Sequence, residues 1–563
     1  MNNLLTEFLA QLEQSLAEYV EAGFMADLAS ALARTGEVKR AIRLNFLKLQ
    51  KQGPLVQMTK SFTRKEKMQA GLDFLNNWPE FAPFKGLWQA VPWADDGFYV
   101  PTIANDLIAK CQAYKLGLYY LQESSAMLPA NLLHVEPNET VADFCAAPGG
   151  KSGKLASDLL GSGCLLSNDL ALSRSKIMLR NLNELAVWHN VLVNADLNDL
   201  AKELKAYFSA VVLDVPCSGE GMIRREHKAL QARMSKDPAA FHNLQLSLLE
   251  AAWQTLKRGG RLVYSTCTFN CAENEAVIYD FLHKYADASV LEAPEFMQKA
   301  AGLQSAFPYR GCQELTKGLR IFPQAGYGEG HFAILLQKQG DLELANQSWQ
   351  DLHAYASKPK LTILQPKHKD EPKKGKASIS KQLPTLTLTS KNLQKLLVEF
   401  VETTFEKEVA EQYVELFTKF PYFKLVGESV EWLIDLDSYG LAELNNKSKR
   451  VSKIHVLSEG IWLGQIKLFK NGCKFTPSHN WALLFTTGQC QYEVKTSATD
   501  ELYTKILEGK SLLKEDVSPY LASSWPTKTH YVLLTVDNYA ACWLQLGQDF
   551  VKTLYPKQWL NSI

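Results

Sequence analysis

The sequence has no long apolar run, no paired cysteine motif and almost no net charge. None of its 563 residues lies in a stretch approaching the 18 or more apolar residues of a membrane span, and MNNLLTEFLAQLEQSLAEY is amphipathic, unlike a signal peptide. Ten scattered cysteines without a CxxC pair disfavour a disulfide scaffold and a zinc site. A net charge of +1 excludes a globally basic nucleic-acid binder. We therefore expect a cytoplasmic protein without a membrane segment or a metal.

Two common nucleotide-binding motifs are also missing from the glycine-rich stretch DFCAAPGGKSGK (143–154). A P-loop needs glycine five residues before its Gly-Lys pair, but Cys145 and Pro148 stand at the two possible positions. No nicotinamide-type GxGxxG is present either. Gly149 and Gly150 therefore require another explanation, which is that they let the backbone approach the carboxylate of a ligand at a helix N-terminus.

Short apolar runs alternate with helix-length segments between residues 139 and 340. This rhythm predicts an α/β fold with a parallel, doubly wound sheet. The expected strands are TVADFCA (140–146), GCLLSND (163–169), NVLVNAD (190–196), SAVVLDVP (209–216), GRLVYSTCT (260–268) and HFAILLQ (331–337).

Changes in composition divide the chain further. Residues 357–383 are rich in lysine and proline and poor in aromatics, which predicts a flexible linker. The domains we expect are a mixed helical extension (1–88), the α/β domain (89–340), the linker, a small domain that starts with a helix (384–448) and a β-rich domain (449–563).

Acidic residues follow the second and third expected strands. Asp169 lies twenty residues beyond the glycine pair, where an acid can hold ribose hydroxyls, and Asp196 could accept a hydrogen bond from an adenine amine. Aspartate also commonly caps a helix after a strand, so each residue alone remains open to that interpretation. Together with the glycine turn, the pattern fits a class I methyltransferase that binds S-adenosylmethionine.

Cys217 and Cys267 follow the fourth and fifth expected strands, at the sheet edge where ligands bind in open α/β folds. Carbon 5 of cytosine is a poor nucleophile until a thiolate adds to carbon 6, so one thiol would attack and a second would assist release. Asp214 would protonate or hydrogen-bond nitrogen 3, and the Pro216 carbonyl would accept from the exocyclic amine. We expect most other cysteines to serve packing alone.

The motifs CAAPGGK (145–151), DVPCSGEG (214–221) and YSTCTF (264–269), with a trailing ENE (273–275), resemble the RNA cytosine-5 methyltransferase family. The resemblance implies a class I fold, S-adenosylmethionine as cofactor, Cys267 as nucleophile and Cys217 as the residue that aids release. Asp214 is expected to serve both catalysis and cofactor binding. The other cofactor residues we expect are Cys145, Ala146, Ala147, Pro148, Gly149, Gly150, Lys151, Asp169, Arg174 and Asp196.

Further stretches narrow the resemblance to the RsmF-like ribosomal RNA small-subunit branch of the family. PWADDGFYV (92–100) and YYLQESSAMLP (119–129) look like the segment before its catalytic core, and the tail is similar to its PUA-like RNA-binding domain. This implies ribosomal RNA or the small ribosomal subunit as partner, a monomeric enzyme and an RNA-binding role for residues 1–88. The sequence departs from the family at KSGK (151–154) and at Cys271, which we interpret as a bystander that could oxidise to a disulfide.

Basic residues outside the motifs would hold the RNA backbone. The expected phosphate contacts are Lys39, Arg40, Arg43, Arg224 and Arg225, whereas Trp462, Trp481 and Trp543 lie in strand-like runs that favour a core. Two alternatives stay open. The substrate could be transfer RNA, or the chain could be a ribosome-assembly factor that binds RNA without catalysis.

Overall fold

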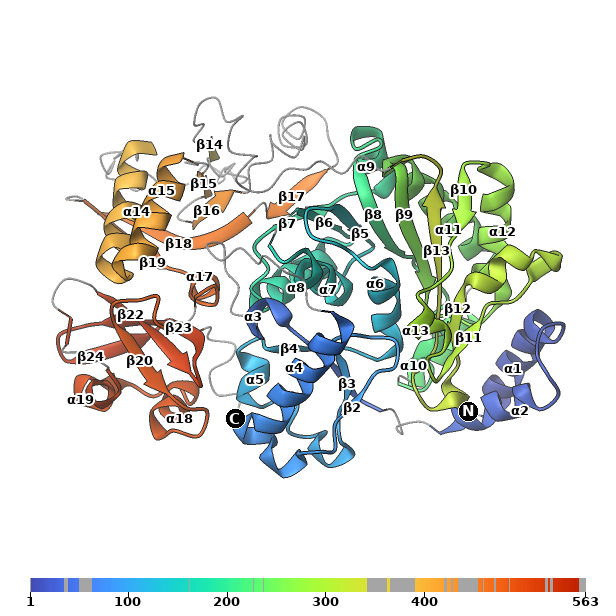
Figure 1. Ribbon diagram of the computed structural model, residues 1–563, viewed down its shortest axis with the longest axis horizontal. Coiled ribbons are helices and arrows are strands. Elements are labelled where there is room, and N and C mark those ends of the chain that lie inside the picture. Colours follow the sequence, from blue (N-terminus) through green and yellow to red (C-terminus); the bar gives the residue numbers. More distant parts are fainter. Residues whose placement is uncertain are drawn as a thin grey trace, which may run out of the picture. The chain divides into compact units, whose positions relative to one another are not determined.

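The computed structural model divides the chain into two compact units, which are described separately (Figure 1). The first unit comprises Met1–Gln50, Met58–Ser348 and Glu443–Ser458, and the second comprises Lys51–Gln57, Trp349–Ala442 and Glu459–Ile563. The structure describes residues 2–34, 39–49, 63–341 without 162, 226 and 236, 362–364, 390–419, 423–426, 429–433, and 454–555 without 459, 470–471, 486, 522–524 and 527–529. Most of the expected linker lies outside these described residues.

All six strands expected from the apolar runs are present in the first unit, and their residues are mostly buried, as in a sheet covered on both faces. The strands are β5 (Thr140–Phe144), β6 (Cys164–Asn168), β7 (Asn190–Asn194), β8 (Phe208–Asp214), β9 (Leu256–Thr266) and β13 (His331–Lys338).

The central strands pair in parallel in the order β7-β6-β5-β8-β9. The expectation of a parallel sheet was wrong at the edges, because β13 runs antiparallel to β9, and the chain enters β13 through residues 322–330, not through a crossover helix. The remaining strands, all antiparallel to their neighbours, are β10 (Ala288–Val290), β11 (Leu303–Ser305), β12 (Leu319–Ile321) and β17 (His455–Ser458).

Helices cover both faces of this sheet. The crossovers β5–α7–β6 and β8–α11–β9 progress in opposite directions along the sheet, so right-handed connections place their helices on opposite faces. The covering helices are α6 (Leu128–Leu133), α7 (Gly150–Leu159), α8 (Leu172–Glu184), α9 (Leu197–Glu203), α11 (Pro238–Thr255) and α12 (Glu275–Lys284). The arrangement, with one antiparallel strand inserted next to the last parallel one, is a class I methyltransferase-like α/β fold.

The N-terminal part of the first unit contributes a helical pair and a small sheet. Helices α1 (Asn2–Leu16) and α2 (Phe24–Ala33) bury Phe8, Leu12 and Leu28 in one apolar cluster with Phe269 of the methyltransferase domain. The four-stranded sheet has the order β2-β3-β1-β4 and spans the expected boundary at residue 88. Its strands are β1 (Ala41–Leu44), β2 (Gln89–Ala90), β3 (Gly97–Tyr99) and β4 (Tyr119–Leu121). Helix α4 (Arg64–Asn77) lies between β1 and β2 along the chain.

The second unit is rich in β-structure and has an aromatic core. Phe400 packs against both Trp481 and Trp543, and these two tryptophan side chains are fully buried, which confirms the expectation that they form a core. Trp462 is partly buried. The helices and strands of the second unit include α14 (Ser390–Thr404), α15 (Lys407–Lys419), β15 (Phe423–Val426), β16 (Ser429–Leu433), β18 (Gly460–Phe469), β19 (Gly472–Pro477), β20 (Glu493–Thr496), α18 (Glu501–Leu507), β22 (Tyr531–Val536), β23 (Tyr539–Leu546) and β24 (Phe550–Thr553).

Among the described residues, no helix is both long and apolar enough to cross a bilayer. The same part of the chain holds no cluster of three or more histidine, cysteine or acidic side chains that could bind a metal ion.

Candidate active site

From β5 the chain adds strands toward one edge of the sheet, and from β8 it adds them toward the other edge. The expected site residues meet at this reversal of strand order between β5 and β8. Phe144 pairs with Leu213, and Asp214 pairs with Ser265 on β9, so the three strands end level with one another. Ligands of open α/β sheets bind at this switch point, beyond the carboxyl ends of the strands. The loops that follow β5, β8 and β9 carry the three motifs.

The loop after β5 turns directly into α7. Gly149 has a φ of 101°, which a residue with a side chain rarely adopts, and it is the N-cap of the helix. A Cβ on Gly150 would lie 3.0 Å from a ring carbon of Tyr120, so a side chain would crowd the turn. Backbone amides at the start of α7 therefore remain approachable, and they suit the carboxylate of a ligand.

Asp169, at the end of β6, is tied to this loop. Its Oδ2 accepts a hydrogen bond from the backbone amide of Ala147 at 3.3 Å and lies 3.4 Å from Arg174, while Oδ1 accepts from Ala171. Arg174 also donates to the carbonyl of Ala147 at 2.6 Å. The acid and the glycine turn thus lie side by side, as the binding of one ligand to both would require.

Among the other expected cofactor residues, Asp196 caps a helix. Asp196 caps α9, because its Oδ1 accepts from the backbone amide of Asn198 at 2.8 Å, so the helix-capping interpretation is realised there. Leu170, next to Asp169, is 70% exposed, and such an apolar side chain suits the face of a base. Burial raises the pKa of the Cys145 thiol well above its usual range, so Cys145 stays protonated. The loop therefore fits S-adenosylmethionine through its backbone amides and Asp169.

Cys217 and Cys267 lie in contact at the ends of β8 and β9. Their sulfur atoms are 3.3 Å apart, longer than a disulfide bond, so no disulfide joins them and both are thiols. The hydrogen bond to the Cys267 sulfur, together with burial, raises the pKa of Cys217 well above its usual range. Cys217 therefore keeps its proton and can donate it to Cys267.

Asp214 and Lys151 form an ion pair beside the thiols. Lys151 Nζ lies 2.6 Å from Asp214 Oδ2, Ser265 Oγ donates to Oδ1 at 2.7 Å, and His331 Nε2 lies 3.5 Å from Oδ1. Burial alone would raise the pKa of Asp214, but Lys151 and His331 outweigh it and hold that pKa well below its usual range. Asp214 is thus a carboxylate that accepts hydrogen bonds and has no proton to give to a base.

The charge on Lys151 also extends toward the nucleophile. Burial would lower the pKa of Lys151, but Asp214, Asp143 and Cys267 raise it above its usual value, so it remains an ammonium group. Nearby, the carbonyl of Pro216 accepts from Gln245 Nε2 at 2.9 Å, and Pro216 is itself exposed. A carbonyl has two lone pairs, so this oxygen can accept a second donor from a substrate.

Two buried carboxylates, which sequence reasoning missed, fix the loops that carry the thiols. Glu220, after the first thiol, accepts from the backbone amides of Phe269 and Asn270 at 2.7 and 3.0 Å. Glu273, after the second, accepts from the backbone amide of Ser218 at 2.9 Å. Each glutamate therefore clamps the opposite loop. The only sequence signal was that both lie inside motifs, in GEG and ENE, without an assigned role.

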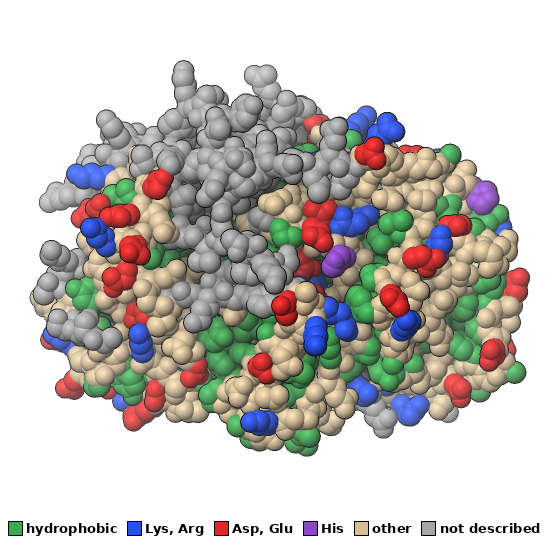
Figure 2. Space-filling view, in the orientation of Figure 1, with side chains coloured by type: hydrophobic (Ala, Val, Ile, Leu, Met, Phe, Trp, Pro, Cys, Tyr) green, Lys and Arg blue, Asp and Glu red, His purple; other side chains and the backbone are tan. Residues whose placement is uncertain are grey.

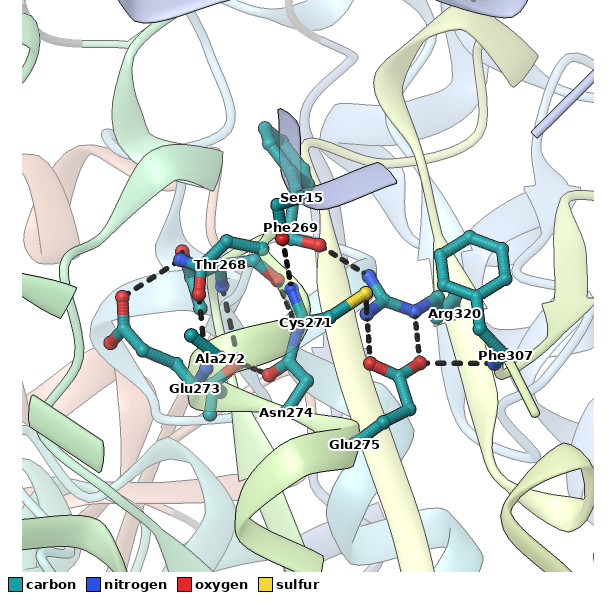
Figure 3. A network of polar contacts seen from close by, with 12 residues as sticks. Ser15, Thr268, Phe269, Cys271, Ala272, Glu273, Asn274, Glu275, Phe307 and Arg320 are labelled. Atoms are coloured by element: carbon teal, nitrogen blue, oxygen red, sulfur yellow. Dashed lines mark hydrogen bonds and ion pairs between the residues drawn. The ribbon is translucent and has the colours of Figure 1, made fainter. Parts of the chain in front are cut away.

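Cys271 belongs to the apolar cluster that α1 and α2 complete, and its sulfur lies next to the Arg320 guanidinium (Figure 3). Its backbone amide donates to Ser15 Oγ of α1 at 2.9 Å. The neighbouring Glu275 accepts from Arg320 Nε at 2.7 Å, and Arg320 also donates to the carbonyl of Phe269 at 2.7 Å. Burial raises the pKa of the Cys271 thiol, and its 3% exposure leaves little access for an oxidant.

The expected phosphate contacts are not equivalent. Arg43 is 1% exposed and faces Asp96 and Gln122, so it was wrong as a phosphate contact: β1 is buried along its whole length. Arg40 donates to the carbonyl of Asn105. Acidic and basic side chains are interspersed over the face in Figure 2, so RNA binding would depend on local clusters.

Comparison with known proteins finds similarity to ribosomal RNA methyltransferases. Residues 130–337 match the model of the family described as 16S rRNA methyltransferase RsmB/F. The chain is 35% identical over 266 residues to "Ribosomal RNA small subunit methyltransferase F" of Salmonella arizonae, covering 46% of this chain and 54% of that protein. The corresponding protein of an Enterobacter species is 31% identical over 342 residues, covering 60% and 64%.

These alignments span about half to two thirds of the length of the curated relatives. Among solved structures, a methyltransferase homologue from Pyrococcus horikoshii is 27% identical, with a TM-score of 0.44, and covers 58% of this chain and 99% of its own. The motifs and the class I methyltransferase-like fold agree with this similarity of residues 130–337 to the RsmB/F methyltransferase family.

Proposed function

We propose that this protein methylates carbon 5 of a cytosine in small-subunit ribosomal RNA through a covalent bond between Cys267 and carbon 6. One observation carries the proposal: two thiols, not joined by a disulfide, lie 3.3 Å apart at the switch point, beside the Lys151–Asp214 ion pair. A protein that only bound RNA would need neither thiol. The names of the curated relatives support ribosomal RNA as the substrate class.

S-adenosylmethionine, the cofactor of the family, supplies an electrophilic methyl group. The glycine turn at Gly149 and the carboxylate of Asp169 would hold its amino-acid part and its ribose. The thiolate of Cys267 adds to carbon 6 of the pyrimidine, which makes carbon 5 nucleophilic. Lys151 is the protonated group that can supply a proton to nitrogen 3, and Asp214 accepts a hydrogen bond from the resulting N–H.

Release requires loss of the proton on carbon 5. Cys217 passes its own proton to the departing sulfur of Cys267 and takes the proton from carbon 5, so the carbon–sulfur bond breaks. Nitrogen 3 returns its proton to Lys151, and Cys267 loses its new proton to solvent before it attacks again. The free lone pair of the Pro216 carbonyl would accept from the exocyclic amine and so favour cytosine over uracil.

The decisive experiment uses the full chain with an unmodified transcript of small-subunit ribosomal RNA. Cys267→Ala should abolish methylation, and Cys217→Ala should accumulate an RNA–protein adduct that migrates slowly on a denaturing gel. Cys312→Ala is the matched control, since this thiol lies far from both loops in sequence and should change neither readout. Full activity in Cys267→Ala would refute the mechanism.

The substrate is tested separately, by mapping 5-methylcytosine in ribosomal and transfer RNA with and without the protein. We expect a ribosomal cytosine to lose its methyl group. Loss confined to transfer RNA would transfer the proposal to that substrate, and no loss would favour the assembly factor. The domains at residues 1–88 and 449–563 are proposed to position the RNA, in keeping with their resemblance to the RsmF-like branch.

A further inference from the structure

A pocket of about 170 Å³ lies beside the catalytic loops and has no role in the mechanism above. It opens between the end of α2, the segment after Gly221 and the connection from β12 to β13. The polar side chains that line it are Arg34, Lys39, Arg224, Gln324 and Glu329. All of these belong to the first unit.

Positive charge predominates in this pocket. Arg34 and Lys39 are exposed, and the Lys39 ammonium lies over the rings of Tyr99 and Tyr327, 5.4 and 5.6 Å from their centres. The third cation, Arg224, is 3.3 Å from Glu329 Oε1. Three cations therefore face one carboxylate.

Several polar atoms of the pocket are buried without a protein partner. Among the described residues, both amide atoms of Gln324 and Oε2 of Glu329 make no hydrogen bond, and the Glu329 side chain is only 6% exposed. Buried polar atoms are almost always hydrogen-bonded in folded proteins. The unused Nε2 of Gln324 is a donor that a polar ligand could accept from, whereas Oε2 of Glu329 is an acceptor unless it carries a proton.

The pocket adjoins the nucleophile through Gly221. The amide of Gly221 donates to the carbonyl of Cys267 at 2.8 Å, and a Cβ on Gly221 would lie 3.0 Å from that oxygen and 3.4 Å from the carbonyl of Glu329. The backbones of Cys267 and Glu329 thus flank a single glycine. A nucleotide joined to a cytosine on Cys267 could reach the pocket, because adjacent residues of one RNA strand follow at spacings of only several ångströms.

The wall on this side is rigidly built by the residues before the catalytic core. Tyr99 Oη and Ser124 Oγ both donate to the carbonyl of Tyr327 at 2.6 Å. The amide of Glu329 donates to Ser125 Oγ at 3.0 Å. The PWADDGFYV and QESSAM stretches thereby fix the Gly326–Gly330 segment, which suits a wall that must hold a ligand in register with the nucleophile.

We propose that this pocket binds the phosphodiester group of the nucleotide next to the target cytosine, with Arg34, Lys39 and Arg224 as its cationic contacts. The inference rests on the proposed function, because it places the same RNA strand across the thiols and the pocket. Burial raises the pKa of Glu329 to about 7, so near neutral pH this carboxyl is partly uncharged and repels an anion less than its formal charge would.

The test measures binding of an unmodified small-subunit rRNA transcript to the full chain carrying Cys267→Ala, which separates binding from methylation. Lys39→Gln and Arg34→Gln should each raise Kd about 3- to 10-fold at physiological salt and reduce the slope of log K against log salt by about one. Lys299→Gln, a 74% exposed lysine outside the pocket, is the matched control and should leave both unchanged.

A second variant tests the nature of the ligand. Glu329→Gln keeps an oxygen for Arg224 but removes the negative charge, so it should tighten RNA binding, most strongly above pH 7. A base amine in the pocket would need the carboxylate, and weaker binding by Glu329→Gln would overturn the phosphate assignment. Unchanged Kd and slope in Lys39→Gln and Arg34→Gln would do the same. Failure of the proposed function would instead appear as absence of methylation by the unmutated protein.

Discussion

The two walls of the active site are held in different ways. The thiol wall, formed by residues 214–221 and 266–275, is clamped by Glu220 and Glu273, which are fully buried and accept hydrogen bonds from backbone amides of the opposite loop. The cofactor wall, formed by residues 145–151, is held at its ligand side by Asp169 and by Arg174, which is 54% exposed. The wall that we propose forms a covalent bond is fixed from within, whereas the wall that we propose binds an exchangeable ligand keeps polar groups accessible.

Removing the clamp of the thiol wall should have the largest effect. Glu273→Ala would leave the Ser218 amide without this acceptor and would remove one of the acceptors of the Gln245 and Asn270 side-chain amides, which also donate to the Pro216 carbonyl and to Glu220. Hydrogen bonds to a charged group contribute about 1.5–3 kcal/mol each, and two of the three donors keep a second acceptor, so we expect a loss of ~3–6 kcal/mol in the free energy of unfolding, measured by urea denaturation. A shift of the nucleophile by about 1 Å should also lower kcat by about 100-fold.

The control for this variant is Glu314→Ala, which removes a glutamate that is 57% exposed and paired only with Lys317. An exposed pair of this kind contributes less than about 1 kcal/mol. If the two variants unfolded at the same urea concentration, the carboxylate clamp would not distinguish the thiol wall.

Buried charges also lie next to the cofactor wall, on helix α7, which begins within that wall. Lys154 of α7 is 2.8 Å from Asp95 and 2.7 Å from Asp158, and Lys67 of α4 contacts the same two carboxylates. Lys154→Met should cost ~2–4 kcal/mol, because it leaves buried acids with too few cations, and urea denaturation measures it. Adding Asp158→Asn should restore part of this loss. No rescue would mean that Lys154 acts through packing alone.

A smaller effect should appear as a dependence on pH. Burial raises the pKa of Asp143, at the end of β5, to about 7 from its ordinary value of 3.8. Its folded form therefore binds a proton more tightly than its unfolded form, and stability is lost as the pH rises from about 4 to 7. Asp143→Asn should gain about 1–3 kcal/mol relative to the unmutated protein between pH 4 and pH 8, measured by urea denaturation.

The groups that face Asp143 do not mask this difference. Ser152 does not titrate in the range, Lys151 keeps its charge, and the lowered pKa of Asp214 places its titration below the window. A difference between the two proteins that stays constant from pH 4 to pH 8 would contradict the assignment of a protonated carboxyl to the cofactor wall.

Sequence reasoning located the strands and the paired thiols because both follow from local pattern. Apolar runs followed by turn residues fix where β8 and β9 end, and the parallel register then brings Cys217 to Cys267. The roles of Glu220 and Glu273 did not follow, because a glutamate near a turn is usually exposed and only the folded chain shows which amides face it. The burial of Arg43 was hidden for the same reason, since its partners lie on distant segments.

The contact between the sulfur atoms of Cys217 and Cys267 limits how many groups can be attached there. At 3.3 Å, a bulky label on either sulfur fills the space in front of the other, so an alkylating reagent should add one adduct per pair. Two neighbouring thiols would then count as one in the mass of the labelled protein, and a small reagent that attached to both would show how far the loops can separate.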